Sequence, residues 1–144
     1  MADAPAAAWR FVHPDFEAGA ANRGVVTDPQ GRIALAAIDV AVHQSLCLLL
    51  SIAPGERLMR PDFGCPLQRL AFQPLDNTTA GLAIHYVEEA VRRWEPRAEI
   101  MLIDAYPSPD AEGVLSIDLH YRIRTTRRER QLRLDVPIDN GAGR

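Results

Sequence analysis

Glu95 and Arg97 flank Pro96 at the point where helical spacing of apolar residues gives way to strand-like spacing. Proline lacks an N–H group and disfavours helical geometry at the residue before it, so we expect a helix to end here. The two charged residues are two positions apart, so in an extended segment they point to the same face. They can therefore pair with each other or bind a partner bidentately. Spacing alone favours the simpler interpretation, a helix stop with a surface ion pair.

Two carboxylates raise the alternative of a peptidoglycan-cleaving glycosidase. Such an enzyme needs two carboxyl groups roughly 5–9.5 Å apart across a cleft, and the sequence offers Glu95 with Asp62. Arg97, however, favours the charged form of Glu95, which suits an ion pair and not a general acid. The sequence contains no G-x-S-x-G, P-loop or histidine-carboxylate metal motif. We therefore expect no catalytic residues, no cofactor and no metal.

Arginines gather around the last predicted hairpin, at Arg122, Arg124, Arg127, Arg128, Arg130 and Arg133. They could contact phosphates, which makes a nucleic-acid-binding domain a further alternative. The hairpin lacks the interleaved aromatic residues that stack on bases, and nearby carboxylates dilute its charge. A charged, solvent-exposed edge that discourages unwanted pairing is the simplest interpretation. Alternatively, the open edge accepts a strand from a partner.

Composition is typical of a globular protein in a reducing compartment. The chain has 144 residues, of which 47% are hydrophobic, and a formal net charge of −3, which does not indicate a nucleic-acid or membrane partner. Cys47 and Cys65 are isolated in the sequence, so we expect buried free thiols. Residues 1–8 lack the pattern of a secretory signal, and the longest apolar run, Leu46–Leu50, is too short to span a bilayer. We therefore expect a chain that is made and assembled in a reducing compartment, the cytoplasm.

The first third of the chain predicts an arm followed by a helix. Residues 1–30 form an extended arm in which Trp9 and Phe11 provide an anchor, and the arm ends in a turn at residues 28–31. Residues 31–144 form a single domain. Its first helix covers residues 32–51, with an apolar stripe of Leu35, Ile38, Val42, Leu46 and Leu49.

A loop at residues 55–66 connects this helix to the next ones. It is dense in proline, glycine and charge, and Arg57, Arg60 and Asp62 are predicted to form a charged cluster that fixes it. Pro66 then opens a short helix that runs to Phe72. A second long helix, 78–94, is capped by residues 76–78. Its predicted inner face is Leu82, Tyr86, Ala90 and Trp94, widened by Ala83, Val87 and Val91, and its outer face carries the pairs Glu88–Arg92 and Glu89–Arg93.

Three strands complete the domain, at about 98–106, 114–124 and 130–138. The second alternates cleanly, with Leu115, Ile117, Leu119, Tyr121 and Ile123 on one face. Such one-sided alternation predicts an antiparallel sheet that is covered on its apolar face. The fold class is therefore α+β: two main helices plus a short helix packed on one face of a three-stranded antiparallel sheet.

Two motifs of this chain, in this order, resemble the short baseplate wedge protein family of contractile tails. The first is the loop from Gly55 to Leu67, G-E-R-L-M-R-P-D-F-G-C-P-L, and the second is W-E-P-R at 94–97. The resemblance covers roughly residues 30–138. The family includes a T-even phage wedge subunit that has carried an acidic-lysozyme label, and subunits of type VI secretion baseplates and extracellular injection particles.

This resemblance implies a structural role and not an enzyme. The family's subunit, in several copies per particle (six are expected), sits in the inner baseplate and contacts the core bundle of the larger wedge proteins, the tube and hub proteins, and the sheath subunit. The family's sheet seeds the first sheath ring by strand exchange, and the matching strands of this chain lie at about 113–124 and 130–138. The residues implied in partner binding are Glu95, Pro96 and Arg97 of the corner, Arg57, Arg60, Pro61, Asp62, Phe63 and Gly64 of the loop, and Arg130, Leu132, Leu134 and Val136 of the last strand.

Overall fold

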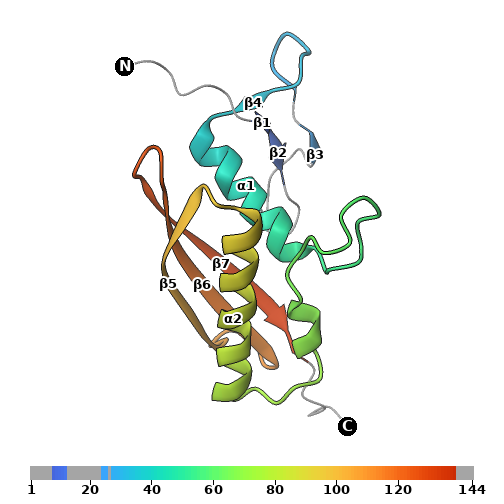
Figure 1. Cartoon of the computed structure of the whole chain (residues 1–144), viewed down its shortest axis with the longest axis vertical. Coiled ribbons are helices and arrows are strands. Elements are labelled where there is room, and N and C mark those ends of the chain that lie inside the picture. The colour runs from blue at the N-terminus through green and yellow to red at the C-terminus, as the bar shows by residue number, and fades with distance from the viewer. Residues whose placement is uncertain (1–7, 13–23, 26, 139–144) are drawn as a thin grey trace. The chain divides into compact units, whose positions relative to one another are not determined.

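Antiparallel strand pairing organises both parts of the chain. The computed structural model describes residues 8–12, 24–25 and 27–138, and the chain falls into two compact units, Met1–Leu48 and Leu49–Arg144. Figure 1 labels the elements along the chain. The boundary between the units falls inside the first helix. Each unit contains its own set of strands.

The first unit contains two short strand pairs. Strand β1 (Ala8–Trp9) pairs with β4 (Leu35–Ala36), and β2 (Phe11–Val12) pairs with β3 (Gly24–Val25), both antiparallel. The predicted turn at residues 28–31 is confirmed. The Asp28 carboxylate accepts hydrogen bonds from the backbone N–H groups of Gln30 and Arg32 at 2.9 and 2.8 Å. The predicted anchoring role of the Trp9 and Phe11 side chains lies outside what the structure describes.

Helix α1 (Ile38–Ser51) begins six residues later than the apolar spacing predicted. Residues 35–36 belong to β4 instead, because their backbone pairs with β1. Leu35 is accordingly 63% exposed and does not join the apolar stripe, whereas Val42, Leu46 and Leu49 are buried as predicted. The helix ends at Ser51, shortly before the Pro54-Gly55 breaker pair.

Helix α2 (Asn77–Trp94) forms where it was predicted. The Asp76 carboxylate caps it by accepting from the N–H of Thr79 at 2.9 Å. The predicted inner face was partly wrong, because Leu82 is exposed and the side chains of Tyr86 and Trp94 are only partly buried. The buried face carries small and β-branched residues: Thr79, Ala83, Val87, Ala90 and Val91. Such residues allow the helix to approach the sheet closely.

Three long strands form the sheet of the second unit, in the order β5–β6–β7: β5 is Ala98–Pro107, β6 is Val114–Ile123 and β7 is Glu129–Pro137. Helix α2 lies against β5 and β6 (Figure 1). The predicted alternation is confirmed, since Leu115, Ile117, Leu119, Tyr121 and Ile123 are all buried. The α+β class, with two helices and a three-stranded antiparallel sheet, is therefore confirmed.

The predicted short helix is a single turn of 3₁₀ helix, η1 (Leu67–Leu70), which lies against α2. It is shorter than predicted: Pro66 precedes it with a non-helical ψ of 43°, and Phe72 lies beyond its end and is exposed. Both cysteines are buried thiols that form no disulfide bond, as predicted. Burial raises the pKa of the Cys65 thiol to about 12, so this thiol stays protonated at neutral pH.

Gly64 provides a direct test of how the loop is packed. Its φ is +132°, and a Cβ added there would lie 2.4 Å from the carbonyl oxygen of Ile52. We expect Gly64→Ala to lower the free energy of unfolding by roughly 2–4 kcal/mol, measured by urea denaturation, because backbone strain and a clash add together.

Two other glycines separate these contributions. Gly55 has a φ of +96° and Gly81 lies within α2, and an added Cβ meets nothing within 4 Å at either position. Gly55→Ala should cost about 1–2 kcal/mol from strain alone, and Gly81→Ala should stabilise by roughly 0.5–1 kcal/mol. A Gly64→Ala variant that is no less stable than Gly55→Ala would show that the close approach to Ile52 does not constrain the loop.

Candidate partner-binding site

The predicted corner residues form one paired unit at the end of α2. Arg97 donates from Nε to Oε1 of Glu95 at 2.7 Å and from Nη2 to Oε2 at 2.9 Å, a bidentate ion pair. The Glu95 side chain is 6% exposed and that of Arg97 is 38% exposed. The hydrogen bond to Glu95 raises the pKa of Arg97. The spacing allowed the two charges either to pair with each other or to bind a partner, and the structure shows them paired with each other, with Glu95 buried and Arg97 partly exposed.

Arg124 fixes the backbone of the same corner. Its Nε donates to the carbonyl of Pro96 at 2.9 Å, and its backbone N–H donates to the carbonyl of Arg97 at 2.9 Å. The N–H of Glu95 also donates to Val91 within the last turn of α2. The corner is thus attached to the helix on one side and to the end of β6 on the other. Of residues 95–97, Pro96 is exposed, Arg97 is partly exposed and Glu95 is buried.

The loop before η1 is held by aromatic stacking and not by the charged cluster that was predicted. The rings of Phe63 and Trp94 meet edge to face, with centroids 5.3 Å apart. The Arg57 guanidinium lies 4.6 Å from the Phe63 centroid, and the Arg60 guanidinium lies 6.0 Å from that of Trp94. Arg57, Arg60 and Asp62 therefore do not form one cluster with each other.

Arg93 completes the connection between the loop and α2. Its guanidinium lies 4.8 Å from the Trp94 centroid and 3.5 Å from the Asp62 carboxylate. This contact corrects the predicted Glu89–Arg93 pair, whereas the predicted Glu88–Arg92 pair is present. Neither Arg93 nor Trp94 was selected from the sequence as a site residue. A lone aromatic within an arginine-rich loop was the available signal, because arginine commonly stacks on aromatic faces.

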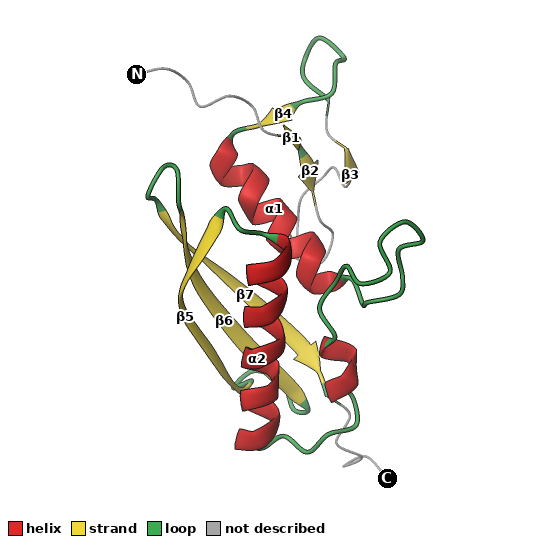
Figure 2. Cartoon of the chain, in the orientation of Figure 1, coloured by secondary structure: helices red, strands yellow, loops and turns green. Residues whose placement is uncertain are grey.

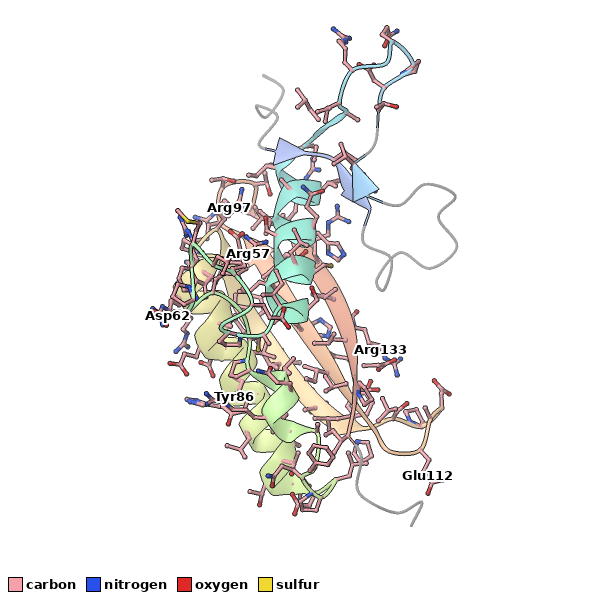
Figure 3. The ribbon with its side chains drawn as sticks, turned by 90° about the vertical axis from the view of Figure 1, so that its right-hand side faces the viewer. Arg57, Asp62, Tyr86, Arg97, Glu112 and Arg133 are labelled. Atoms are coloured by element: carbon pink, nitrogen blue, oxygen red, sulfur yellow. The ribbon has the colours of Figure 1, made fainter. Side chains whose placement is uncertain are left out.

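The loop and the corner therefore belong to one surface, because Trp94 touches Phe63 and directly precedes Glu95. In Figure 3, Arg57, Asp62 and Arg97 lie toward one side of the unit, and Arg133 lies on the strands away from them. We call this surface the corner–loop surface: residues 57–64 with residues 93–97. The residues predicted on β7 lie at the far edge of the sheet, since β6 separates β5 from β7.

The pairing register of β7 decides which of its backbone groups face outward. Ile123 donates to the carbonyl of Arg128 and Ile138 donates to that of Gly113. Bonded and non-bonded pairs alternate along antiparallel strands, so the even-numbered residues of β7 bond to β6. The backbone groups at the open edge belong to the intervening residues, Gln131, Arg133 and Asp135. Sequence reasoning selected Arg130, Leu132, Leu134 and Val136, whose own backbone groups the register directs toward β6.

Several arginines of the hairpin are engaged within the sheet. Arg122 donates to Glu99 on β5 at 2.8 Å, which lowers the pKa of Glu99 and raises that of Arg122. Arg133 donates to Ser116 at 3.3 Å and lies 3.7 Å from Asp135. These contacts engage arginine side chains that could otherwise bind phosphates. The hairpin is therefore a weaker candidate for a phosphate-binding patch than its sequence suggested.

The carboxylates proposed for a glycosidase are both paired with arginine, Glu95 with Arg97 and Asp62 with Arg93. Within residues 8–12, 24–25 and 27–138, no group of three or more metal-ligating side chains is placed to hold an ion. Neither helix of the described part combines the length and apolarity of a membrane span.

Comparison with known proteins identifies the class and then the family. A Geobacter sulfurreducens protein, whose crystal structure is described as that of a candidate tail lysozyme, has 38% identity and a TM-score of 0.68 over 76% of this chain and 98% of its own. A chain of the anti-feeding prophage baseplate matches with 24% identity and a TM-score of 0.57, over 83% of this chain and 84% of its own. The fold is thus one found in contractile-tail baseplates.

The family model for baseplate wedge protein gp25 matches residues 36–128, and the chain belongs to this family. The baseplate wedge protein gp25 of Enterobacteria phage T4 is 26% identical over 83 residues, which are 58% of this chain. The match spans 62% of the length of the phage protein. The matched family region contains the loop, α2, the corner and the first two strands of the sheet, and it ends just before β7.

The strength of the part-buried ion pair at the corner can be measured by a double-mutant cycle. Arg97→Ala should lower the free energy of unfolding by about 1–3 kcal/mol, because it leaves the Glu95 carboxylate buried without its guanidinium. Glu95→Ala with Arg97→Ala should cost clearly less than the sum of the single changes. Arg92→Ala, which breaks the exposed pair with Glu88, is the matched control and should cost less than about 0.5 kcal/mol. Additive effects at 95 and 97 would mean that the two side chains do not support each other.

Proposed function

We propose that this chain is a structural subunit of the baseplate of a contractile injection particle. It links the core bundle of the larger wedge proteins and the tube–hub to the first ring of sheath, and it seeds the sheath by accepting a strand. The open edge of β7 is the observation that carries this proposal. Family membership supports the baseplate setting, and the geometry of the second unit supports the two contacts.

The β7 edge is suited to strand addition. Its register with β6 is unbroken from Arg122–Glu129 to Val114–Pro137, so the outward N–H and C=O groups recur at every second residue without interruption. The other edge strand, β5, contains an irregularity between Ile100 and Leu102. Such bulges disfavour pairing of an edge strand with a further strand. Backbone pairing also fixes register, which a ring of sheath subunits needs in order to begin at a defined height.

The corner–loop surface is suited to docking on the larger wedge proteins. Arg124 holds the backbone of the corner, and the Phe63–Trp94 contact holds the loop. Binding therefore costs little conformational entropy. The partly exposed Arg97 and the exposed Pro96 present a charged and a rigid group side by side, and charge placement of this kind gives orientation in an interface.

The particle would contain several copies of the chain. The anti-feeding prophage baseplate that contains the structural relative is six-fold symmetrised, and we infer six copies here as well. Assembly would take place in the cytoplasm, where two buried free thiols remain reduced. The partners are proteins only, namely the larger wedge proteins, the sheath subunit and the tube or hub proteins, with no nucleic acid and no membrane insertion.

Strand addition can be blocked without disturbing the β6–β7 ladder. Gln131→Pro removes an N–H that faces the open edge, and proline is tolerated on edge strands. Baseplates that contain this variant should assemble but carry tubes without ordered sheath, as counted by electron microscopy. Gln131→Ala changes the same side chain and keeps the N–H, so it should give normal sheath. Normal sheath on particles with Gln131→Pro would exclude pairing at this position.

The chain should have no lysozyme activity, despite the label carried by the Geobacter relative. Both carboxylates that could act are engaged in ion pairs with arginine, whereas a general acid must be within hydrogen-bond reach of the glycosidic oxygen. The purified chain should release no soluble fragments from peptidoglycan between pH 4 and 8, with hen lysozyme as the positive control. Release that is abolished by Glu95→Gln would establish an enzyme.

A further inference from the structure

Two adjacent apolar side chains project into solvent from the loop that joins α1 to η1. Leu58 is 98% exposed and Met59 is 93% exposed, the largest values among the exposed large hydrophobic residues of the described part. Figure 2 shows this loop as a long excursion between the two helices. Single exposed apolar residues are ordinary on protein surfaces, but two neighbours with almost no cover from their own chain are a candidate interaction site.

The loop holds these two residues in a defined position. At its base the N–H of Gly55 donates to the carbonyl of Pro61 at 2.6 Å, and the N–H of Phe63 donates to the carbonyl of Arg60 at 3.1 Å. The two residues that flank the tip, Arg57 and Arg60, lie over the rings of Phe63 and Trp94. The tip is therefore ordered before any partner binds, which lowers the entropic cost of binding.

We propose that Leu58 and Met59, here called the plug, insert into an apolar socket of a different protein subunit, and that carboxylates rim this socket. The inference rests on the proposed function as a baseplate subunit, and it names a contact that the motif comparison alone does not. The sequence around the plug is Arg-Leu-Met-Arg, so burial of the apolar pair brings two guanidiniums to the rim. Met and Arg are both enriched at protein–protein interfaces.

Two hollows in the described part of this chain would make poor sockets for a second copy, on grounds of charge. The groove between the loop and α2, about 200 Å³ in volume, has Arg69, Arg93 and Glu89 in its lining, so its charged groups are mainly basic. The hollow on the outer sheet face beside Met101 and Leu102 has one carboxylate and one guanidinium in its lining, from Glu129 and Arg130. Neither surface complements two arginines.

A lipid surface is also a poor partner. The plug offers only two apolar side chains, and stable membrane anchoring generally requires a larger apolar face or a second anchoring signal. A shaped protein socket can surround both side chains and pair with both arginines. The observations therefore favour a protein partner with an acidic rim.

Site-specific photocrosslinking tests where the plug lies in the particle. A diazirine amino acid is placed at position 59 in one preparation and at position 72 in another, because Phe72 is also strongly exposed but lies outside the loop. Position 59 should give at least a tenfold higher yield of adduct with one larger baseplate protein, at an apolar segment flanked by Asp or Glu. Equal yields, lipid adducts or adducts with a second copy of this chain would overturn the proposal.

A substitution pair tests whether the contact matters. Leu58→Ser with Met59→Ser should reduce incorporation of the chain into purified baseplates at least tenfold, while the unfolding temperature of the free chain stays unchanged because both side chains are exposed. Met101→Ser with Leu102→Ser, another adjacent exposed pair, is the control and should incorporate normally. If the wild-type chain is absent from baseplates, the proposed function fails. If the plug variant is incorporated as well as wild type, only this inference fails.

Discussion

A buried carboxylate must be compensated by a partner, and this requirement fixes the corner between α2 and β5. Glu95 loses its solvent at the last turn of the helix, and Arg97 compensates with two short hydrogen bonds. Proline between them restricts the backbone conformation, and Arg124 donates hydrogen bonds to the carbonyls of residues 96 and 97. The ion pair, the proline and the strand end therefore stabilise one geometry together, and Trp94 extends that geometry to the loop through Phe63.

This arrangement separates two surfaces of the second unit. The corner–loop surface belongs to the end of α2 and is rigid through side-chain contacts. The β7 edge lies across the sheet and presents backbone groups in an unbroken register. A subunit that connects one assembly to another under mechanical load needs two such separated contacts. In the proposed role, the corner–loop surface would provide orientation through shape and charge, and the β7 edge would provide register through hydrogen bonds.

Local signals in the sequence were sufficient for much of the fold. The Asp76 cap and the apolar period predicted α2, and strict alternation predicted the buried face of β6. Signals that depend on distant residues were not visible. The predicted start of α1 was wrong because β4 pairs with β1, whose residues lie 26 and 28 positions earlier in the chain. The inner face of α2 was only partly predicted. Ala83 and Val87 are buried as expected, whereas the larger Leu82 and Tyr86 are not, because the helix packs closely on the sheet through small and β-branched residues.

The candidate site shows the same division. The pairing of Glu95 with Arg97 follows from a spacing of two around proline, so it was among the predicted alternatives, but its burial was not. The contacts of Arg60 and Phe63 with the Trp94 ring depend on how residues 57–63 fold back to α2, which no local pattern specifies. The outward backbone groups of Gln131, Arg133 and Asp135 could be assigned only once the register of β7 was known.

Residue-resolved amide hydrogen exchange, compared between the free chain and the sheathed particle, tests strand addition at β7 most directly. In the free chain the amides of Leu132 and Leu134 should be protected by their bonds to β6, while those of Gln131, Arg133 and Asp135 should exchange quickly. In the sheathed particle the second group should slow by at least a hundredfold. Unchanged fast exchange at residues 131, 133 and 135 in particles with complete sheath would contradict a role for this edge in seeding the sheath.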